Sequence, residues 1–405
     1  MSRLRTVLNL TVLVAALGYF VDMFDLLLFP IVRVQSLNAL GITGDAQQRV
    51  FYFLLDAQMV GMLLGGILWG ILGDKKGRLS TLFGSIALYS LANLANAFVV
   101  NVPQYAVARF LAGLGLAGEL GAAITLVSEI LPKDLRGYGT TLVAAIGVSG
   151  TVAASLVGKY LTWQQAYLVG GGLGLSLLAL RFGIRESGMF RAAEASHLSR
   201  GDFLSLFTNR DRFLRYLRCI LIGVPMWYVV GILVTSAPEF AKVLHVGGPV
   251  SAGTAVAFCY GGLTVGDFAS GFLSQWMRSR TRVVGLFMAL TGTGVLGYLL
   301  LRGLSPALFY ALIAFLGFAI GYWAVFVTVG AEQFGTNLRA TVATTVPNFV
   351  RGSVVLITSL FLMLKGRLGL LGSAWVVGAL CFTMAILALR GMEDTHGKDL
   401  DFVER

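Results

Sequence analysis

The chain has 405 residues, of which 57% are hydrophobic and only 13% are charged, whereas soluble proteins keep about a quarter of their residues charged. This composition excludes an ordinary soluble enzyme and predicts a protein that crosses a membrane repeatedly. The net charge of +11 lies in short links between apolar runs. That arrangement is typical of membrane topology signals, so we expect no nucleic-acid partner.

Apolar runs near the bilayer length of about 20 residues recur about twelve times along the chain. The first six lie near residues 9–32, 51–72, 80–100, 104–130, 138–160 and 163–183. The second six lie near residues 214–237, 251–276, 283–301, 306–330, 339–363 and 369–390. We therefore expect an all-α polytopic membrane protein with about twelve transmembrane helices. The expected parts are two six-helix bundles (1–183 and 213–390), a cytoplasmic crossover loop (184–212) and a polar, mobile tail (391–405).

Basic residues are unevenly shared between alternate links. With the amino terminus placed inside, most lysines and arginines fall in inner links. The outer side then carries Arg33, Arg49, Arg109, Lys159, Lys242, Arg302, Lys365 and Arg367. Because cytoplasmic links are enriched in lysine and arginine, we expect both termini to be cytoplasmic.

The link between the second and third runs reads GILGDKKGR, from Gly70 to Arg78. So few residues, so basic, between two membrane-length runs predict a tight cytoplasmic hairpin. The pattern G-x-L-G-D-K-x-G-R closely resembles the signature loop of the major facilitator superfamily. This resemblance implies a transporter built from two pseudo-symmetric six-helix bundles.

The two halves of the chain also resemble each other. SEILPKDLRGYGTT in the first half aligns with AEQFGTNLRATVATT in the second, so that Glu129 matches Glu332 and Arg136 matches Arg339 at one offset. Such a repeat predicts a substrate site between the halves, near the middle of the membrane.

Asp74 is expected to meet the positive amino end of the eleventh span, and Arg78 is expected to pair with Asp74 or Glu129 at the same depth. These contacts would close the transporter on its cytoplasmic side. The expected cytoplasmic gate consists of Gly70, Asp74, Gly77, Arg78, Glu129, Arg136, Glu332 and Arg339. The alternative is that these residues are topology signals only, with the two glycines providing the turn.

Charged residues inside apolar spans are costly and usually face a cavity or each other. Asp22 and Asp25 share one face of the first span, with Tyr19 one turn earlier. Two close carboxylates disfavour joint ionisation, so one of them is expected to bind a proton. The candidates for proton coupling are Asp22, Asp25, Glu119 and Asp267. For Glu119 and Asp267 a structural role, such as a bond to a backbone group, is the alternative.

Arg351 lies roughly twelve residues into the eleventh span, too deep for its guanidinium to reach water easily. A buried guanidinium needs an anionic partner, and a carboxylate substrate is one candidate. A permanent pair with Asp22, Asp25 or Asp267 is the other. The expected substrate-binding residues are Arg351, Asn348, Tyr19, Tyr228 and Tyr322. Trp227 and Trp323 are further candidates, although for the aromatic residues helix packing is the simpler interpretation.

Four further motifs sharpen the resemblance. D-M-F-D in the first span resembles the D-G-F-D element of aromatic acid:proton symporters, and RFLAGLGLAGE in the fourth resembles a run that these share with metabolite:proton symporters. RESGMF (185–190) is similar to their E-S-P-R-F element, and RATVATTVPNFVR (339–351) keeps their spacing to a membrane arginine, which organic anion transporters also carry. The resemblance implies that Arg351 meets a substrate carboxylate and that Asp22 and Asp25 carry the proton. Met23, Gly188 and Val342 depart from the pattern.

The leading hypothesis is a proton-coupled symporter of a small organic anion that works by alternating access, as a monomer in a bacterial inner membrane. The alternative is a carrier of a sugar or another neutral solute, in which Arg351 is structural. His197, His245 and His396 all fall in links or in the tail, so we expect neither a metal site nor enzymatic chemistry, and no cofactor.

Overall fold

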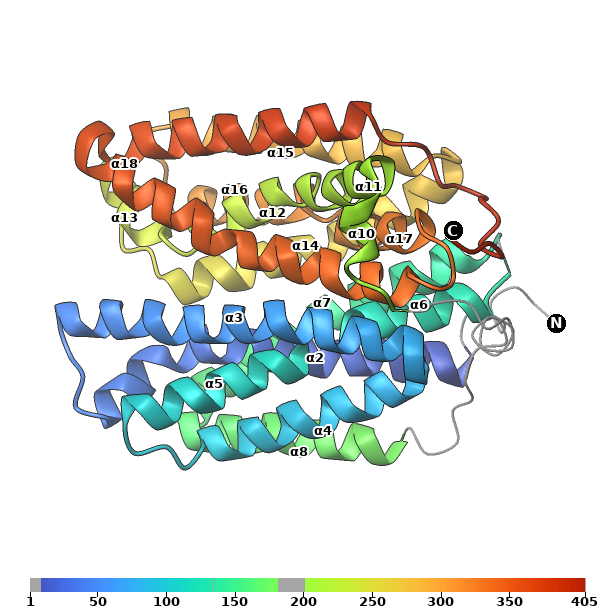
Figure 1. The fold of residues 1–405 in the computed structure, drawn as a ribbon. Coiled ribbons are helices and arrows are strands. Elements are labelled where there is room, and N and C mark those ends of the chain that lie inside the picture. Colours follow the sequence, from blue (N-terminus) through green and yellow to red (C-terminus); the bar gives the residue numbers. More distant parts are fainter. Residues whose placement is uncertain (1–8, 133, 181–200, 405) are drawn as a thin grey trace.

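The computed structural model describes residues 9–132, 134–180 and 201–404, which form helices joined by short links (Figure 1). The first half of the chain forms the lower group of helices in Figure 1. Its helices are α2 (Leu10–Ala39), α3 (Asp45–Lys76), α4 (Arg78–Asn96), α5 (Val102–Leu116), α6 (Glu119–Ile130), α7 (Arg136–Tyr160) and α8 (Trp163–Leu180).

The second half forms the upper group. Its elements are α10 (Ser205–Thr208), α11 (Arg210–Leu221), α12 (Val224–Tyr228), the π-helix η1 (Val229–Val234), α13 (Ala237–Val243), α14 (Ala252–Trp276), α15 (Arg280–Leu300), α16 (Pro306–Ala319), α17 (Trp323–Glu332) and α18 (Arg339–Arg390). The start of helix α2 and the tail after α18 lie at the same end of the molecule (Figure 1). We call this end the terminal end. The opposite end is the far end.

Several spans are made of more than one helix. The fourth, Val102–Ile130, is divided into α5 and α6, and the tenth, Pro306–Glu332, is divided into α16 and α17. Helix α18 has 52 residues, more than twice the bilayer length, and turns back at Gly369, whose φ of 67° suits glycine. The twelve predicted spans are thereby accounted for, and the fold prediction is confirmed, with boundaries that differ by a few residues.

Close packing within each half depends on glycine. A β-carbon at Gly113 would lie 2.1 Å from the backbone oxygen of Gln58, where α5 crosses α3. In the second half, a β-carbon at Gly317 would lie 1.9 Å from the backbone oxygen of Cys259, where α16 crosses α14. Small residues allow helices to approach closely in a membrane, and here they do so at corresponding places of the two halves.

The two halves meet along α18 with α3 and along α14 with α7. Of the predicted crossover loop, the structure describes residues 201–212, which include α10 and the start of α11. The RESGMF element (185–190) lies outside the described residues.

Two sequence expectations are wrong. Arg109 does not lie in an outer link but within α5, where it is fully buried. The tail, expected to be mobile, instead packs against the terminal end, and Leu400 within it is fully buried.

Candidate functional site

A small cavity lies between the two halves. Tyr19 and Met23 of α2 line it from the first half, and the second half contributes aromatic residues and one charge. The main lining residues from the second half are Trp227, Tyr260, Trp323 and Arg351. The space open to the centres of water molecules is about 20 Å³, which suits roughly one water molecule. The cavity is therefore closed around its lining residues in this conformation, and an organic solute needs it to widen.

The Arg351 guanidinium is fully buried against this cavity. It donates to the Tyr19 hydroxyl (3.4 Å) and to Asn348 Oδ1 (3.4 Å), and it lies 5.3 Å from the ring centre of Trp323. No carboxylate within the described ranges comes within ion-pairing distance of it, and its Nε has no hydrogen-bond partner there. The permanent ion pair that the sequence left open is thus not formed in this conformation.

Two hydrogen-bond acceptors of Arg351, Asn348 and Tyr19, each also make a hydrogen bond across the interface of the halves. Asn348 Nδ2 donates to the backbone oxygen of Ala117 (2.9 Å), which lies at the break between α5 and α6. The Tyr19 hydroxyl accepts a hydrogen bond from Trp323 Nε1 (2.9 Å). Two residues predicted to bind substrate therefore position the arginine, and Tyr19 also lines the cavity.

Asp22 and Asp25 are both fully buried, but they face different charges. Neither Asp22 oxygen has a hydrogen-bond partner in the described part of the chain, and Arg351 is the cation that acts on this carboxylate. Asp25 lies beside Asn93 and the Arg109 guanidinium, inside the first half. The positive charge of Arg351 therefore acts on Asp22, and that of Arg109 acts on Asp25.

Glu119 and Asp267 lie beside the breaks that divide the fourth and tenth spans, Glu119 at the break itself and Asp267 on the neighbouring helix α14. Glu119 is the first residue of α6, and its charge also acts on Asp22. Asp267 accepts a hydrogen bond from the backbone N–H of Ala324 (2.9 Å) at the start of α17. A carboxylate at the positive end of a helix stabilises that end, so Asp267 has a visible structural role.

The structure does not bring every predicted residue to the cavity. The Tyr228 hydroxyl donates to the backbone oxygen of Ala374, and that of Tyr322 donates to the backbone oxygen of Ile222, and neither tyrosine lines the cavity. Tyr260 lines it and was missed. It lies two helical turns before Asp267 on α14, and that spacing is the signal that sequence reasoning could have used.

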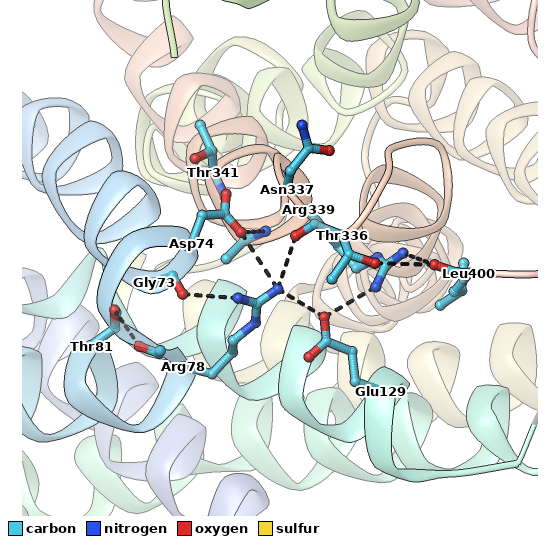
Figure 2. A network of polar contacts seen from close by, with 12 residues as sticks. Gly73, Asp74, Arg78, Thr81, Glu129, Thr336, Asn337, Arg339, Thr341 and Leu400 are labelled. Atoms are coloured by element: carbon cyan, nitrogen blue, oxygen red, sulfur yellow. Dashed lines mark hydrogen bonds and ion pairs between the residues drawn. The ribbon is translucent and has the colours of Figure 1, made fainter. Parts of the chain in front are cut away.

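The terminal end is closed by a buried network between the halves (Figure 2). Asp74, in the last turn of α3, accepts hydrogen bonds from the backbone N–H groups of Ala340 (3.0 Å) and Thr341 (2.8 Å), at the amino end of α18. Glu129 of the first half accepts from Arg78 (2.9 Å) and from Arg339 of the second half (3.1 Å). We call these contacts the terminal-end network.

The two glycines of the predicted gate lie beside this network. Gly77 separates α3 from α4 with a φ of 101°, which favours glycine. A β-carbon at Gly70 would lie 2.9 Å from the Cα of Thr341 on α18, so glycine allows α3 and α18 to touch there.

A second acid–base pair forms in the other half. Glu332 pairs with Arg280 (3.3 Å), and Arg136 donates to the backbone oxygen of Ser128 (2.8 Å). Arg280 was not predicted, although it begins α15 as Arg78 begins α4, and each of these arginines pairs with a glutamate of its own half. The internal repeat was the signal that could have found it.

Asp394 of the tail caps the amino end of α15. It accepts hydrogen bonds from the Ser279 and Thr281 hydroxyls and from the backbone N–H of Arg280 (3.2 Å). Burial raises the pKa of Asp394, but these hydrogen bonds outweigh it and lower the pKa to about 2. Because the pKa is lower in the folded protein, this carboxylate stabilises the fold above about pH 4, and the contribution is lost as the pH falls toward about 2.

We therefore expect Asp394→Asn to lower the melting temperature by roughly 1–3 °C, equally at pH 5.5 and pH 8. Thermal unfolding of the purified protein at both pH values measures this. Asp401→Asn is the matched control, because Asp401 is an exposed carboxylate of the same tail. An Asp394→Asn effect present at only one of the two pH values would contradict the assignment.

These features define a polytopic membrane transporter of two pseudo-symmetric six-helix halves, closed at one end around a central cavity. The Major Facilitator Superfamily profile matches residues 11–361, and the chain belongs to this family. Its members are transporters, so the chain is not an enzyme.

Curated relatives and solved structures agree with this assignment. The chain is 36% identical over 123 residues to the niacin transporter NiaP of Acinetobacter baylyi, which covers 29% of this chain and 28% of that protein. It is 26% identical over 221 residues to the putative niacin/nicotinamide transporter NiaP of Bacillus subtilis, covering 54% and 53%. The chain thus spans about half or less of these two relatives. The proton:xylose symporter XylE, solved with 6-bromo-6-deoxy-D-glucose, shares the fold with a TM-score of 0.76 over 97% of both chains at 16% identity.

Proposed function

We propose that the protein is a secondary active transporter that moves a small organic carboxylate together with a proton. The observation that carries this proposal is Arg351, the one charged residue among those lining the cavity, which has no carboxylate within ion-pairing distance in the described chain. A guanidinium recognises a carboxylate through two parallel hydrogen bonds. Tyr260 and Trp323 line the same cavity as Arg351. Their rings favour a substrate whose remaining part is flat and apolar, such as an aromatic monocarboxylate. The two relatives are named a niacin transporter and a putative niacin/nicotinamide transporter, and niacin is an aromatic monocarboxylate, which supports this class.

The proton is assigned to the Asp22–Asp25 pair. A substrate carboxylate at Arg351 would cancel the positive charge that acts on Asp22, leaving the negative charges of Glu119 and Asp25 beside it. A proton bound by the pair removes that repulsion. Substrate and proton would then bind together and leave together, which is the requirement of symport. Asp267 is not assigned to the proton, because it already accepts a hydrogen bond at the start of α17.

Alternating access would operate by breaking the terminal-end network while the far end closes. A pocket at the far end, lined by Asp56 of α3, Glu239 of α13 and Lys365 of α18, supports entry from that side. From the distribution of lysine and arginine we propose that the terminal end is cytoplasmic. The protein would then act as a monomer in a bacterial inner membrane, with bundles at 1–183 and 213–390.

Proton movement in proteoliposomes tests this function. Nicotinate, benzoate, a sugar and an organic cation are added in turn to vesicles with a pH indicator outside. We expect a carboxylate to make the outside solution more alkaline as it enters, and the sugar to have no effect. Equilibration of the sugar without pH change, with no response to any acid, would favour the carrier of neutral solutes instead.

A further inference from the structure

The tail, residues 391–404, is attached to the second half at its beginning. Asp394 caps α15, as described above, and the Thr395 hydroxyl donates to Glu332 Oε2 (2.7 Å). The Gln333 side chain donates to the backbone oxygen of Glu393 (2.9 Å), and Arg218 donates to that of Gly391 (2.6 Å). These contacts fix the start of the tail over α11, α15 and α17.

The end of the tail is attached more tightly. Glu404 accepts two hydrogen bonds from Arg215 of α11, each of 3.0 Å, and this fork-to-fork pair is the strongest kind of surface ion pair. The backbone N–H of Glu404 donates to Asn337 Oδ1 (2.9 Å), and Asn337 Nδ2 donates back to the backbone oxygen of Glu404 (3.0 Å). Between these points the backbone N–H of Thr336 donates to the backbone oxygen of Phe402 (2.8 Å).

The tail contacts the link between α17 and α18, residues 333–338. This link takes part in the terminal-end network. The backbone oxygen of Thr336 accepts a hydrogen bond from Arg78 of the first half (3.2 Å). Arg339, which pairs with Glu129 of the first half, also donates to the backbone oxygen of Leu400 in the tail (Figure 2). The tail therefore touches the groups that the second half presents to the first.

The tail also contacts the first half directly. Arg136 of α7 donates to the backbone oxygen of Lys398 at 3.5 Å. Separation of the halves at the terminal end would break this contact together with those of Arg78 and Arg339. The hydrogen bonds to the tail from Arg136, Arg339 and the Thr336 hydroxyl end on backbone oxygens of the tail, so these bonds depend on where its backbone runs.

We propose that the tail is a strap that holds the 333–338 link in the position required for the closed terminal end. Detachment of the strap would leave Arg339 and the Thr336 carbonyl less well positioned, and so favour the conformation open at this end. The position of such an equilibrium depends only on the free-energy difference between its two states. The proposal rests on alternating access and on no particular substrate.

Pulsed electron resonance between spin labels on the two halves measures this opening without substrate. The labels are placed at Ser80 and Arg282, which are exposed near the terminal ends of α4 and α15, in a background with the three buried cysteines replaced. Two test variants are compared with the parent: Glu404→Gln, and a chain that ends at Met392. Asp401→Asn is the matched control, because it removes one tail carboxylate that contacts no described arginine.

We expect Glu404→Gln to raise the fraction of long inter-label distances roughly threefold, in keeping with a partly exposed ion pair. The truncated chain is expected to raise it further, and Asp401→Asn to leave it unchanged. If the truncated chain does not yield folded protein, Glu404→Gln against Asp401→Asn decides the matter. Distances in Glu404→Gln equal to those of the parent, or an equal shift in Asp401→Asn, would overturn the strap. Because no substrate is used, failure here is separate from failure of the proposed transport function.

Discussion

Arg351→Ala is expected to reduce carboxylate uptake roughly a hundredfold, since truncation of one side of a buried charge pair costs about 2–5 kcal/mol. The guanidinium is buried at the cavity and has no carboxylate within ion-pairing distance in the described chain, so the substrate is left to provide the anion. Arg351→Lys keeps the charge but loses the planar fork and the fit to the Trp323 ring. We expect that variant to raise KM more than it lowers kcat.

Initial rates of labelled nicotinate or benzoate uptake into proteoliposomes measure both effects. Arg302→Ala is the matched control, because Arg302 is an exposed arginine near the far end that donates to the backbone oxygen of Leu299 in the last turn of α15 (2.9 Å). This control is expected to transport like the parent. Uptake in Arg351→Ala within a fewfold of the parent, with a lowered melting temperature, would make Arg351 structural and favour a neutral substrate.

The fold could be predicted from the sequence because membrane spans are long apolar runs that composition alone reveals. The breaks within spans could not. The division of the fourth span at Ala117–Gly118 leaves hydropathy unchanged, and the break depends on tertiary partners such as Asn348, which donates to the backbone oxygen of Ala117. The turn at Gly369 within α18 lies one residue beyond the predicted link, 364–368, which the polar residues Lys365 and Arg367 reveal in the sequence.

The sequence indicates candidate site residues where burial of charge is expensive and therefore informative. Arg351, Asp22 and Asp25 stand out because a charge inside a span requires an explanation. Aromatic residues are ordinary in membrane helices, so the sequence could not separate Trp323, which lines the cavity, from Tyr228, which packs against α18.

The tail was misjudged for a different reason. Its polar composition is typical of a mobile segment, and its contacts with Arg136 and Arg339 use backbone oxygens, which leave no mark in the sequence. Arg215, which pairs with Glu404, was counted only as a topology signal.

Asp25→Asn is expected to abolish proton-driven accumulation while leaving exchange of substrate across the membrane intact. Asp25 and Arg109 are buried within the first half, and neither lines the cavity, so substrate binding at Arg351 should keep its KM. Asparagine has the shape of the protonated acid but cannot release a proton. A pH gradient of one unit sustains roughly tenfold accumulation in electroneutral one-proton symport, since 1.4 kcal/mol corresponds to tenfold. In the variant the accumulation ratio should fall to about one.

Asp22→Asn should behave differently from Asp25→Asn. The comparison identifies which of the two carboxylates links substrate binding at Arg351 to proton binding. Its carboxylate is the member of the pair on which Arg351 acts, so its loss should change KM as well as coupling. Asp401→Asn is the control, because Asp401 is an exposed carboxylate of the tail that lines neither the central cavity nor the pocket at the far end. Uptake under an imposed pH gradient, measured beside exchange without one, separates the three variants. If Asp25→Asn still accumulates substrate when the outside is acidic, the proton does not travel on this carboxylate. If Asp22→Asn then does not accumulate substrate, the proton site is Asp22, next to Arg351. Arg109 would in that case serve only to neutralise Asp25 within the first half.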